Sequence, residues 1–388
     1  MTDLERVLRP LLTDATVDEL AASFVDDPTV TRWWTEPVDY TFGTPTTVGA
    51  LRLKAETKTE PGAKTENETG AVEWSVFVKA IRSVRHWPLL HTLPPAVREA
   101  AMASDFWRFE ADVYATDLTE ALPAGLRLPV VHRVADLGDE HLAMILEDVP
   151  TLADPQLWDT ARFAKAAELL GRASARLTER DALPVQSRTP AGPLAVFYDN
   201  YLVPLILPTL QSDDLWAHPL LKSADATLRT DLKELASRLP AVLDRLAHLP
   251  QVMVHGDASP QNLLIPADQP DTFVAIDWSL GGLAPAGEDL AQLLLGLAHA
   301  GQLELSELTT LRPILVTAFA AGLRAEGRDH PEADLAYALD GGLLFRSAFT
   351  ALPLARLQEP LTDELAETFR SRFAMTRHLV DQALAMPR

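Results

Sequence analysis

The spacing of apolar residues along the chain changes near residue 150, and this change predicts two parts of different architecture. Before it, short apolar runs or runs of alternating apolar and polar residues indicate strands at 50–55, 72–81, 128–135 and 142–147. After it, Leu and Ala recur at helical spacing in stretches at 155–180, 223–248, 286–300, 305–326, 331–357 and 362–386. We therefore expect an α+β protein, with a strand-rich part over residues 1–149 and a mostly helical part over residues 150–388.

Three further segments complete the predicted first part. Residues 4–34 carry Leu, Val and Ala at helical spacing and are interpreted as a short helical prelude, with Thr16 as a candidate N-cap. Residues 56–70 are polar and are expected to form a long exposed connection. Residues 95–118 predict one helix, because large apolar residues recur there at about one-turn intervals.

Composition and charge restrict the classes of function. The chain has 388 residues with 47% hydrophobic and 23% charged residues, which is typical of a soluble globular protein of two domains. The formal net charge of −21 argues against nucleic acid as a partner, and it favours either solubility or the attraction of a cationic small molecule. The sequence has no cysteine, no signal-peptide pattern and no run of about 18 apolar residues. We therefore expect a cytoplasmic protein without a membrane partner.

The stretch 252–278, VMVHGDASPQNLLIPADQPDTFVAIDW, holds the candidate chemistry. Two apolar runs end in Asp257 and Asp277, and Asn262 follows the first acid by five residues. Phosphoryl transfer requires a carboxylate to orient or deprotonate the acceptor hydroxyl, and oxygen ligands for Mg²⁺. This pattern predicts Asp257 as the base and Asn262 and Asp277 as the metal ligands. The turn-rich segment 266–271 is expected to join both runs as a hairpin that brings the two acids to one side.

Lys79 lies in the apolar run 76–81, where a buried ammonium group costs free energy unless a negative group meets it. Two kinds of partner are open: an acid on a following helix, and the phosphates of a nucleotide. Glu110 falls inside the predicted helix. Alternatively, Lys79 is an edge-strand lysine and Glu110 is a solvated helix residue.

The motifs carry a resemblance to a known family. His255-Gly256-Asp257 with Asn262, followed by Ile276-Asp277-Trp278, resembles the signature of the aminoglycoside phosphotransferase and choline kinase family, within the protein-kinase-like fold. Protein kinases have His-Arg-Asp and Asp-Phe-Gly at these places, so Gly256 and Trp278 indicate the small-molecule branch. The resemblance implies two lobes, a small antiparallel-sheet N-lobe and a larger, mostly helical C-lobe.

The same resemblance implies a nucleotide site in the N-lobe. Lys79 is similar to the phosphate-binding lysine of the family, and Glu110 to its helix partner, with Glu99 as the rival for that role. Thr44 lies in residues 43–47, which resemble the nucleotide-covering loop although they lack a Gly-x-Gly-x-x-Gly pattern. Glu147 and Val149 bound the expected hinge, whose backbone would bind adenine.

Two more residues are expected to hold the catalytic loop. Asp289, in Gly287-Glu288-Asp289-Leu290-Ala291, resembles the aspartate that opens a helix after the metal acid, and it is expected to cap or tether the loop. His255 is expected to hold the loop by hydrogen bonding.

The predicted function is therefore an ATP- and Mg²⁺-dependent kinase, with GTP also open as the donor. It would phosphorylate a hydroxyl of a small molecule such as an aminoglycoside, an amino alcohol or a sugar. The alternative is a catalytically silent pseudokinase that binds nucleotide. The acids Glu304, Glu307, Asp334 and Asp340 are candidate acceptor contacts, whereas Arg346 either binds an acidic acceptor or pairs internally. The sequence indicates no oligomeric state.

Overall fold

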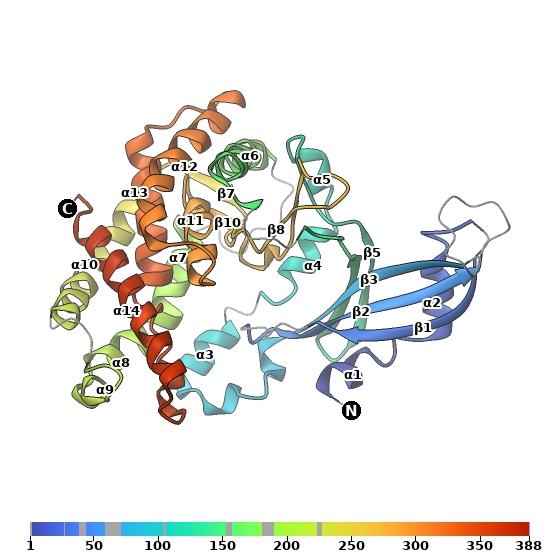
Figure 1. Ribbon diagram of the computed structural model, residues 1–388, viewed down its shortest axis with the longest axis horizontal. Coiled ribbons are helices and arrows are strands. Elements are labelled where there is room, and N and C mark those ends of the chain that lie inside the picture. Colours follow the sequence, from blue (N-terminus) through green and yellow to red (C-terminus); the bar gives the residue numbers. More distant parts are fainter. Residues whose placement is uncertain are drawn as a thin grey trace. The chain divides into compact units, whose positions relative to one another are not determined.

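A computed structural model describes residues 2–26, 28–38, 44–58, 71–103, 106–152, 157–180, 190–222 and 227–387. The chain forms two compact units (Figure 1). Unit 1 comprises Met1–Asp117 and Leu128–Pro150, and unit 2 comprises Leu118–Arg127 and Thr151–Arg388. The predicted division after residue 149 assigned Leu118–Arg127 to the first part, and the structure differs there. The reason is that strand β4 (Leu126–Arg127) pairs in parallel with β9 (Phe273–Ala275) of unit 2.

Unit 1 is built on a five-stranded antiparallel sheet with the order β1-β2-β3-β6-β5. Its strands are β1 (Thr29–Pro37), β2 (Thr47–Lys58), β3 (Ala71–Arg82), β5 (Val131–Gly138) and β6 (His141–Glu147). Figure 1 draws β1, β2 and β3 as long neighbouring arrows. Alternate side chains of β2 and β3, including Leu53, Val76 and Val78, form a core with Leu8 and Val17 of the N-terminal helices.

The sequence predicts a helical segment over residues 4–34, but only part of this segment is helical in the structure. Helices α1 (Asp3–Leu8) and α2 (Asp14–Ala21) are followed by strand β1, because the run TVTRWWTEP is rich in β-branched and aromatic residues. The N-cap of α2 is Thr13, whose hydroxyl accepts a hydrogen bond from the backbone N–H of Thr16. Thr16 itself lies inside the helix.

The single helix predicted over 95–118 is divided into α3 (Pro95–Ala103), α4 (Phe109–Tyr114) and α5 (Leu118–Ala121). In α3 only Val97 is buried, so this helix lacks the apolar stripe that would stabilise a longer one. Helix α4 buries most of its residues, among them Glu110.

Helices make up most of unit 2, as expected. They are α6 (Thr160–Glu179), α7 (Gly192–Phe197), α8 (Leu207–Gln211), α9 (Asp213–Ala217), α10 (Leu228–His248), α11 (Asp289–His299), α12 (Leu305–Ala325), α13 (Glu332–Leu343) and α14 (Asp363–Leu384). Helices α6 and α12 approach closely at two glycines: a Cβ on Gly171 would lie 2.3 Å from the Phe319 carbonyl oxygen, and one on Gly322 would lie 2.1 Å from that of Glu168. Within the described residues, no helix is both long and apolar enough to cross a membrane.

The short strands of unit 2 pair differently from the prediction. Strand β7 (Gln251–Val254) pairs with β10 (Gly282–Pro285), whereas β9 pairs with β8 (Leu263–Leu264). The turn-rich segment 266–271 therefore closes a hairpin of β8 and β9, and the expected β7–β9 hairpin is wrong. The reason is that the chain turns after β7, where Asn262 N donates to Ser259 O, and forms β8 before it reaches that segment.

Candidate active site

The loop of residues 255–262 follows β7, and its second residue is a glycine that no other residue could replace without strain. Gly256 has φ = 82°, in the left-handed region. A Cβ at this position would lie 2.0 Å from the carbonyl oxygen of Leu280. The bulky arginine that protein kinases carry at the equivalent place does not fit this backbone.

The side chain of Asp289 and the ring of His255 itself hold loop 255–262 in place. Asp289 accepts hydrogen bonds from the backbone N–H groups of His255 and Gly256, at 2.9 and 2.8 Å. The His255 ring bonds through Nε2 to the Ile276 carbonyl at 2.9 Å, and its Nδ1 accepts from the Asp257 N–H at 3.2 Å. Burial raises the pKa of Asp289, and His255 and the two N–H donors oppose this shift. These contacts fix the start of the loop from both sides.

Asp257 and Asn262 meet across the loop. The Asn262 Nδ2 group donates to the Asp257 carbonyl at 2.9 Å and to its Oδ2 at 3.0 Å. Because Nδ2 is used in these bonds, Oδ1 is the amide atom that remains for a metal. The Asp257 side chain is 31% exposed, so the oriented carboxylate stays open to a small molecule.

Asp277 follows β9 in a left-handed conformation, with φ = 57°. Aspartate tolerates this region better than most residues do, and such positions concentrate at functional sites. Its Oδ1 accepts a hydrogen bond from the Ser279 hydroxyl at 2.8 Å. The next residue, Trp278, is buried and packs against the His255 ring, with 4.5 Å between ring centroids. Trp278 therefore supports the loop from within the core.

The oxygen atoms of Asn262 and Asp277 suit a hard divalent cation such as Mg²⁺. In the part of the chain that the structure describes, no group of three or more His, Asp or Glu side chains is placed to hold a metal ion. A pair of protein ligands fits Mg²⁺ bound together with a substrate phosphate, because this ion usually keeps waters and phosphate oxygens in its shell.

Arg346 also contacts loop 255–262. Its Nη1 donates to the Gly256 carbonyl, and its Nη2 lies 3.5 Å from Asp257 Oδ1. On the opposite side, Nη1 lies 3.6 Å from Oε1 of Glu288, a fully buried carboxylate. Burial raises the pKa of Glu288 to about 7; Arg346 opposes the shift, whereas Asp289 and Asp257 add to it. Arg346 thus pairs internally, which was one of the two alternatives for this residue.

In unit 1, Lys79 of β3 forms a buried ion pair with Glu110 of α4. The Lys79 Nζ lies 2.6 Å from Glu110 Oε2, and the two residues are 6% and 3% exposed. The rival acid, Glu99, is exposed on α3. The partner of this lysine in the structure is therefore Glu110, and Lys79 lies in a central strand opposite Met144, not at a sheet edge.

The model of a phosphotransferase enzyme family matches residues 108–334, more than half of the chain. The chain belongs to this phosphotransferase family. The matched span includes Glu110, Asp257, Asn262 and Asp277, and the resemblance that the His-Gly-Asp motif indicated is confirmed. The α+β class is confirmed as well.

Solved structures similar to this phosphotransferase have low sequence identity to it. An aminoglycoside phosphotransferase from Alicyclobacillus acidocaldarius has 15% identity and a TM-score of 0.47, with 97% of this chain and 98% of that chain covered. A choline kinase from Cryptosporidium parvum has 12% identity and a TM-score of 0.49, with 96% and 98% covered. A macrolide 2'-phosphotransferase from Brachybacterium faecium has 17% identity and a TM-score of 0.41, with 97% and 98% covered. No curated protein matches the sequence.

The remaining predicted nucleotide residues of the phosphotransferase lie at the ends of its sheet. Thr44 is exposed before β2, and its hydroxyl lies 2.8 Å from that of Thr47. Gly43, the first residue of the predicted nucleotide loop, lies outside the described residues. Glu147 ends β6, and its backbone N–H donates to the Val130 carbonyl at 2.8 Å, while the Val130 N–H donates to Glu147 Oε2 at 2.9 Å. Val149 is buried one residue before the end of unit 1.

The sequence of the phosphotransferase does not predict that Arg346 contacts both Asp257 and Glu288. Arg346 stands out in the sequence as a cation among apolar residues. No sequence pattern indicates its partners Glu288 and Asp257, which lie 58 and 89 positions before it. Among the proposed acceptor contacts, Asp340 forms a two-bond ion pair with Arg312, at 2.8 and 2.6 Å. The Asp340 carboxylate is therefore paired with another side chain of the protein.

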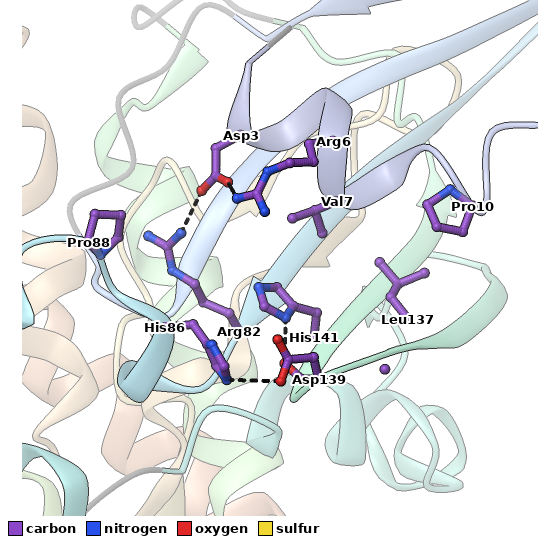
Figure 2. Close-up of a pocket in the computed structure, with 11 residues that line it drawn as sticks. Asp3, Arg6, Val7, Pro10, Arg82, His86, Pro88, Leu137, Asp139 and His141 are labelled. Carbon is purple, nitrogen blue, oxygen red and sulfur yellow. Dashed lines mark hydrogen bonds and ion pairs between the residues drawn. The ribbon is translucent and has the colours of Figure 1, made fainter.

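The phosphotransferase also has a cavity of about 430 Å³ in unit 1, which holds none of the predicted site residues. Figure 2 shows Arg82 directed toward Asp3 and the two histidines, His86 and His141, beside Asp139. The Arg82 Nη1 lies 3.0 Å from Asp3 Oδ2. The charged groups of this cavity are therefore largely paired with one another.

Proposed function

We propose that this phosphotransferase moves the terminal phosphoryl group of ATP, with Mg²⁺, to a hydroxyl group of a small molecule. The observation that carries the proposal is the geometry at Asp257, a partly exposed carboxylate whose Oδ2 is held by Asn262 in a loop tethered by Asp289. A base fixed in this way can meet a hydroxyl with little loss of orientation on binding.

Asp257 would accept the hydroxyl proton as the acceptor oxygen forms its bond to the terminal phosphorus. The bond from that phosphorus to the bridging oxygen breaks, and ADP leaves. Asn262 and Asp277 would hold Mg²⁺, which when bound neutralises charge on the phosphate oxygens. Lys79, held by Glu110, would bind nucleotide phosphates as a cation within unit 1.

The acceptor is proposed to be an aminoglycoside, an amino alcohol or a sugar. The net charge of −21 supports an amine-bearing acceptor, because a negative field raises the local concentration of cations. Arg346 gives no support to an acidic acceptor, since its guanidinium is directed at Gly256, Asp257 and Glu288.

The test is ATP consumption over a panel of these acceptors, followed by mass detection of the phosphorylated product and repeated with GTP as the donor. The matched variant is Asp257→Asn, which keeps the shape of the side chain but cannot take the proton. We expect its rate to fall at least about a hundredfold while the variant keeps its fold. Full activity in Asp257→Asn would refute the role of Asp257 as the base. A thermal shift with Mg-ATP and no product from any acceptor would instead indicate the silent pseudokinase.

A further inference from the structure

We infer that Arg346 is a positioning residue for this phosphate transfer, and that Glu288 is the buried counter-charge that holds its guanidinium in place. The inference rests on the proposed function, in which Asp257 is the base. Both residues lie in unit 2, and Arg346 lies beyond the span that the family model matches.

The guanidinium of Arg346 joins three parts of the chain at one point. It donates to the carbonyl of Gly256, the residue that must adopt the left-handed conformation before the base. It lies 3.5 Å from Oδ1 of Asp257 and 3.6 Å from Oε1 of Glu288. A planar group with five fixed N–H donors is suited to such a role, whereas the single ammonium of lysine is not.

These contacts complete the orientation of the Asp257 carboxylate. One oxygen, Oδ2, receives the Nδ2 hydrogen bond of Asn262, and the other, Oδ1, faces Arg346. Rotation of the carboxylate would break one contact or the other. The base is thereby held from two sides while it remains partly exposed to an acceptor.

Arg346 lies in a π-helical turn at the end of α13. The π-turn Leu344–Ala348 follows this helix directly, and Leu344, Phe345 and Ala348 are each at most 1% exposed. Phe345 makes an edge contact with Tyr198, at 5.8 Å between centroids. A π-helical turn changes the direction in which successive side chains point, and π-helical segments are frequent at functional sites. Here it directs Arg346 out of an apolar turn toward loop 255–262.

Glu288 explains why the guanidinium stays at this position. Its carboxylate is fully buried at the start of α11, and neither oxygen has a hydrogen-bond partner among the described residues. A buried carboxylate without hydrogen bonds is costly unless a cation meets it. The Arg346 guanidinium is that cation, and its side chain is only 14% exposed. The two charges therefore stabilise each other beside the base.

The test compares Arg346→Met, Arg346→Lys, Glu288→Gln and the double variant Arg346→Met/Glu288→Gln in phosphate transfer to the best acceptor. Arg346→Met should lower kcat roughly a hundredfold, because a misplacement of about 1 Å costs a factor of this size, with the KM for ATP changed less than about threefold. Arg346→Lys should recover only part of the loss, since lysine keeps the charge without the fork of donors. A further variant, Arg346→Ala, leaves room for the lost group, so ethylguanidinium in the buffer should restore its activity and ethylammonium should not.

The double variant separates positioning from folding. Arg346→Met leaves Glu288 as an unpaired buried charge, whereas the double variant removes that charge and should melt at or above the temperature of Arg346→Met. Because Glu288 acts through Arg346, Glu288→Gln should lower kcat in the wild-type background and have no further effect in the Arg346→Met background. The control is Arg172→Met, which breaks the Arg172–Glu326 pair between residues to which no role in the reaction is assigned, and it should keep kcat.

Each outcome decides between the alternatives. A folded Arg346→Met or double variant with wild-type kcat would overturn the inference and leave the proposed function intact. Independent, multiplicative effects of Glu288→Gln and Arg346→Met on kcat would overturn the role of Glu288. If the wild-type protein itself transfers no phosphate to any acceptor, the proposed function has failed and the inference fails with it.

Discussion

The buried carboxyl of Glu288 gives a prediction about stability that needs no substrate. We consider the substitution Glu288→Gln, which keeps the size of the side chain and removes its titration. The pKa of Glu288 rises from 4.5 to about 7 on folding, chiefly because the group is fully buried. Arg346 opposes the rise, Asp289 and Asp257 add to it, and His255 is the further titratable group facing this cluster through Asp289.

The sign of the effect follows from proton binding. Between pH 4.5 and pH 7 the folded state holds the Glu288 proton more tightly than the unfolded state does. The contribution of this group to stability is therefore fully present below pH 4.5 and is lost as the pH rises to about 7. At about 1.4 kcal/mol for each pH unit, the loss amounts to roughly 3 kcal/mol. Gln does not titrate, so Glu288→Gln should gain roughly 3 kcal/mol relative to the wild type between pH 4.5 and pH 8.

The measurement is the free energy of unfolding in urea for both proteins from pH 4.5 to pH 8. Any constant cost of placing an amide at this site cancels, because only the change of the difference with pH is compared. The control is Glu307→Gln, an exposed carboxyl of α12, for which we expect a small difference at every pH. A wild-type to Glu288→Gln difference that stays constant with pH, or that changes in the opposite direction, would refute the reasoning.

Three further predictions concern the other constrained residues. Gly256→Ala should lower the unfolding free energy by at least about 2 kcal/mol, measured in urea, because φ = 82° strains alanine and its Cβ meets the Leu280 carbonyl. Lys79→Met should cost roughly 3–5 kcal/mol because it removes the cation that faces the buried Glu110 carboxylate, and Lys79→Met/Glu110→Leu should recover much of this loss in the same assay. Asp277→Asn should keep the melting temperature, since asparagine tolerates the left-handed region, but should raise the Mg²⁺ concentration for half-maximal activity at least about tenfold in a metal titration. An unchanged Mg²⁺ requirement would exclude Asp277 as a ligand.

Local patterns were sufficient to predict the class of the fold and most of its long elements. Alternation in β3 and helical spacing in α12 each arise from one buried face, and such a face is visible in a single stretch of sequence. The pattern failed where tertiary pairing decides. Strand β7 pairs with β10 instead of β9, and β4 joins the sheet of unit 2, although no local feature marks either partner.

The motif also assigned roles to residues of loop 255–262, and these stay predictions, but it did not indicate what holds the residues in place. The tether by Asp289 follows the resemblance, and its two backbone hydrogen bonds agree with that expectation. The contact from Arg346 depends on how α13 ends. The helical spacing over 331–357 does not predict the π-turn at Leu344–Ala348. A change from one helical hydrogen-bonding pattern to another leaves no clear mark on apolar spacing.

Loop 255–262 is short, and its conformation includes a glycine in the left-handed region, so local interactions alone do not define it. Three elements far apart in the sequence define it instead: Asp289 of α11 holds its N–H groups, the Ile276 carbonyl after β9 holds its histidine, and Arg346 holds the Gly256 carbonyl. Each contact acts on a different backbone or side-chain group, so the loss of one should leave the fold in place while the Asp257 carboxylate loses orientation. The orientation of Asp257 is therefore a property of unit 2 as a whole, and substitutions such as Arg346→Met should reduce turnover more than they reduce nucleotide binding.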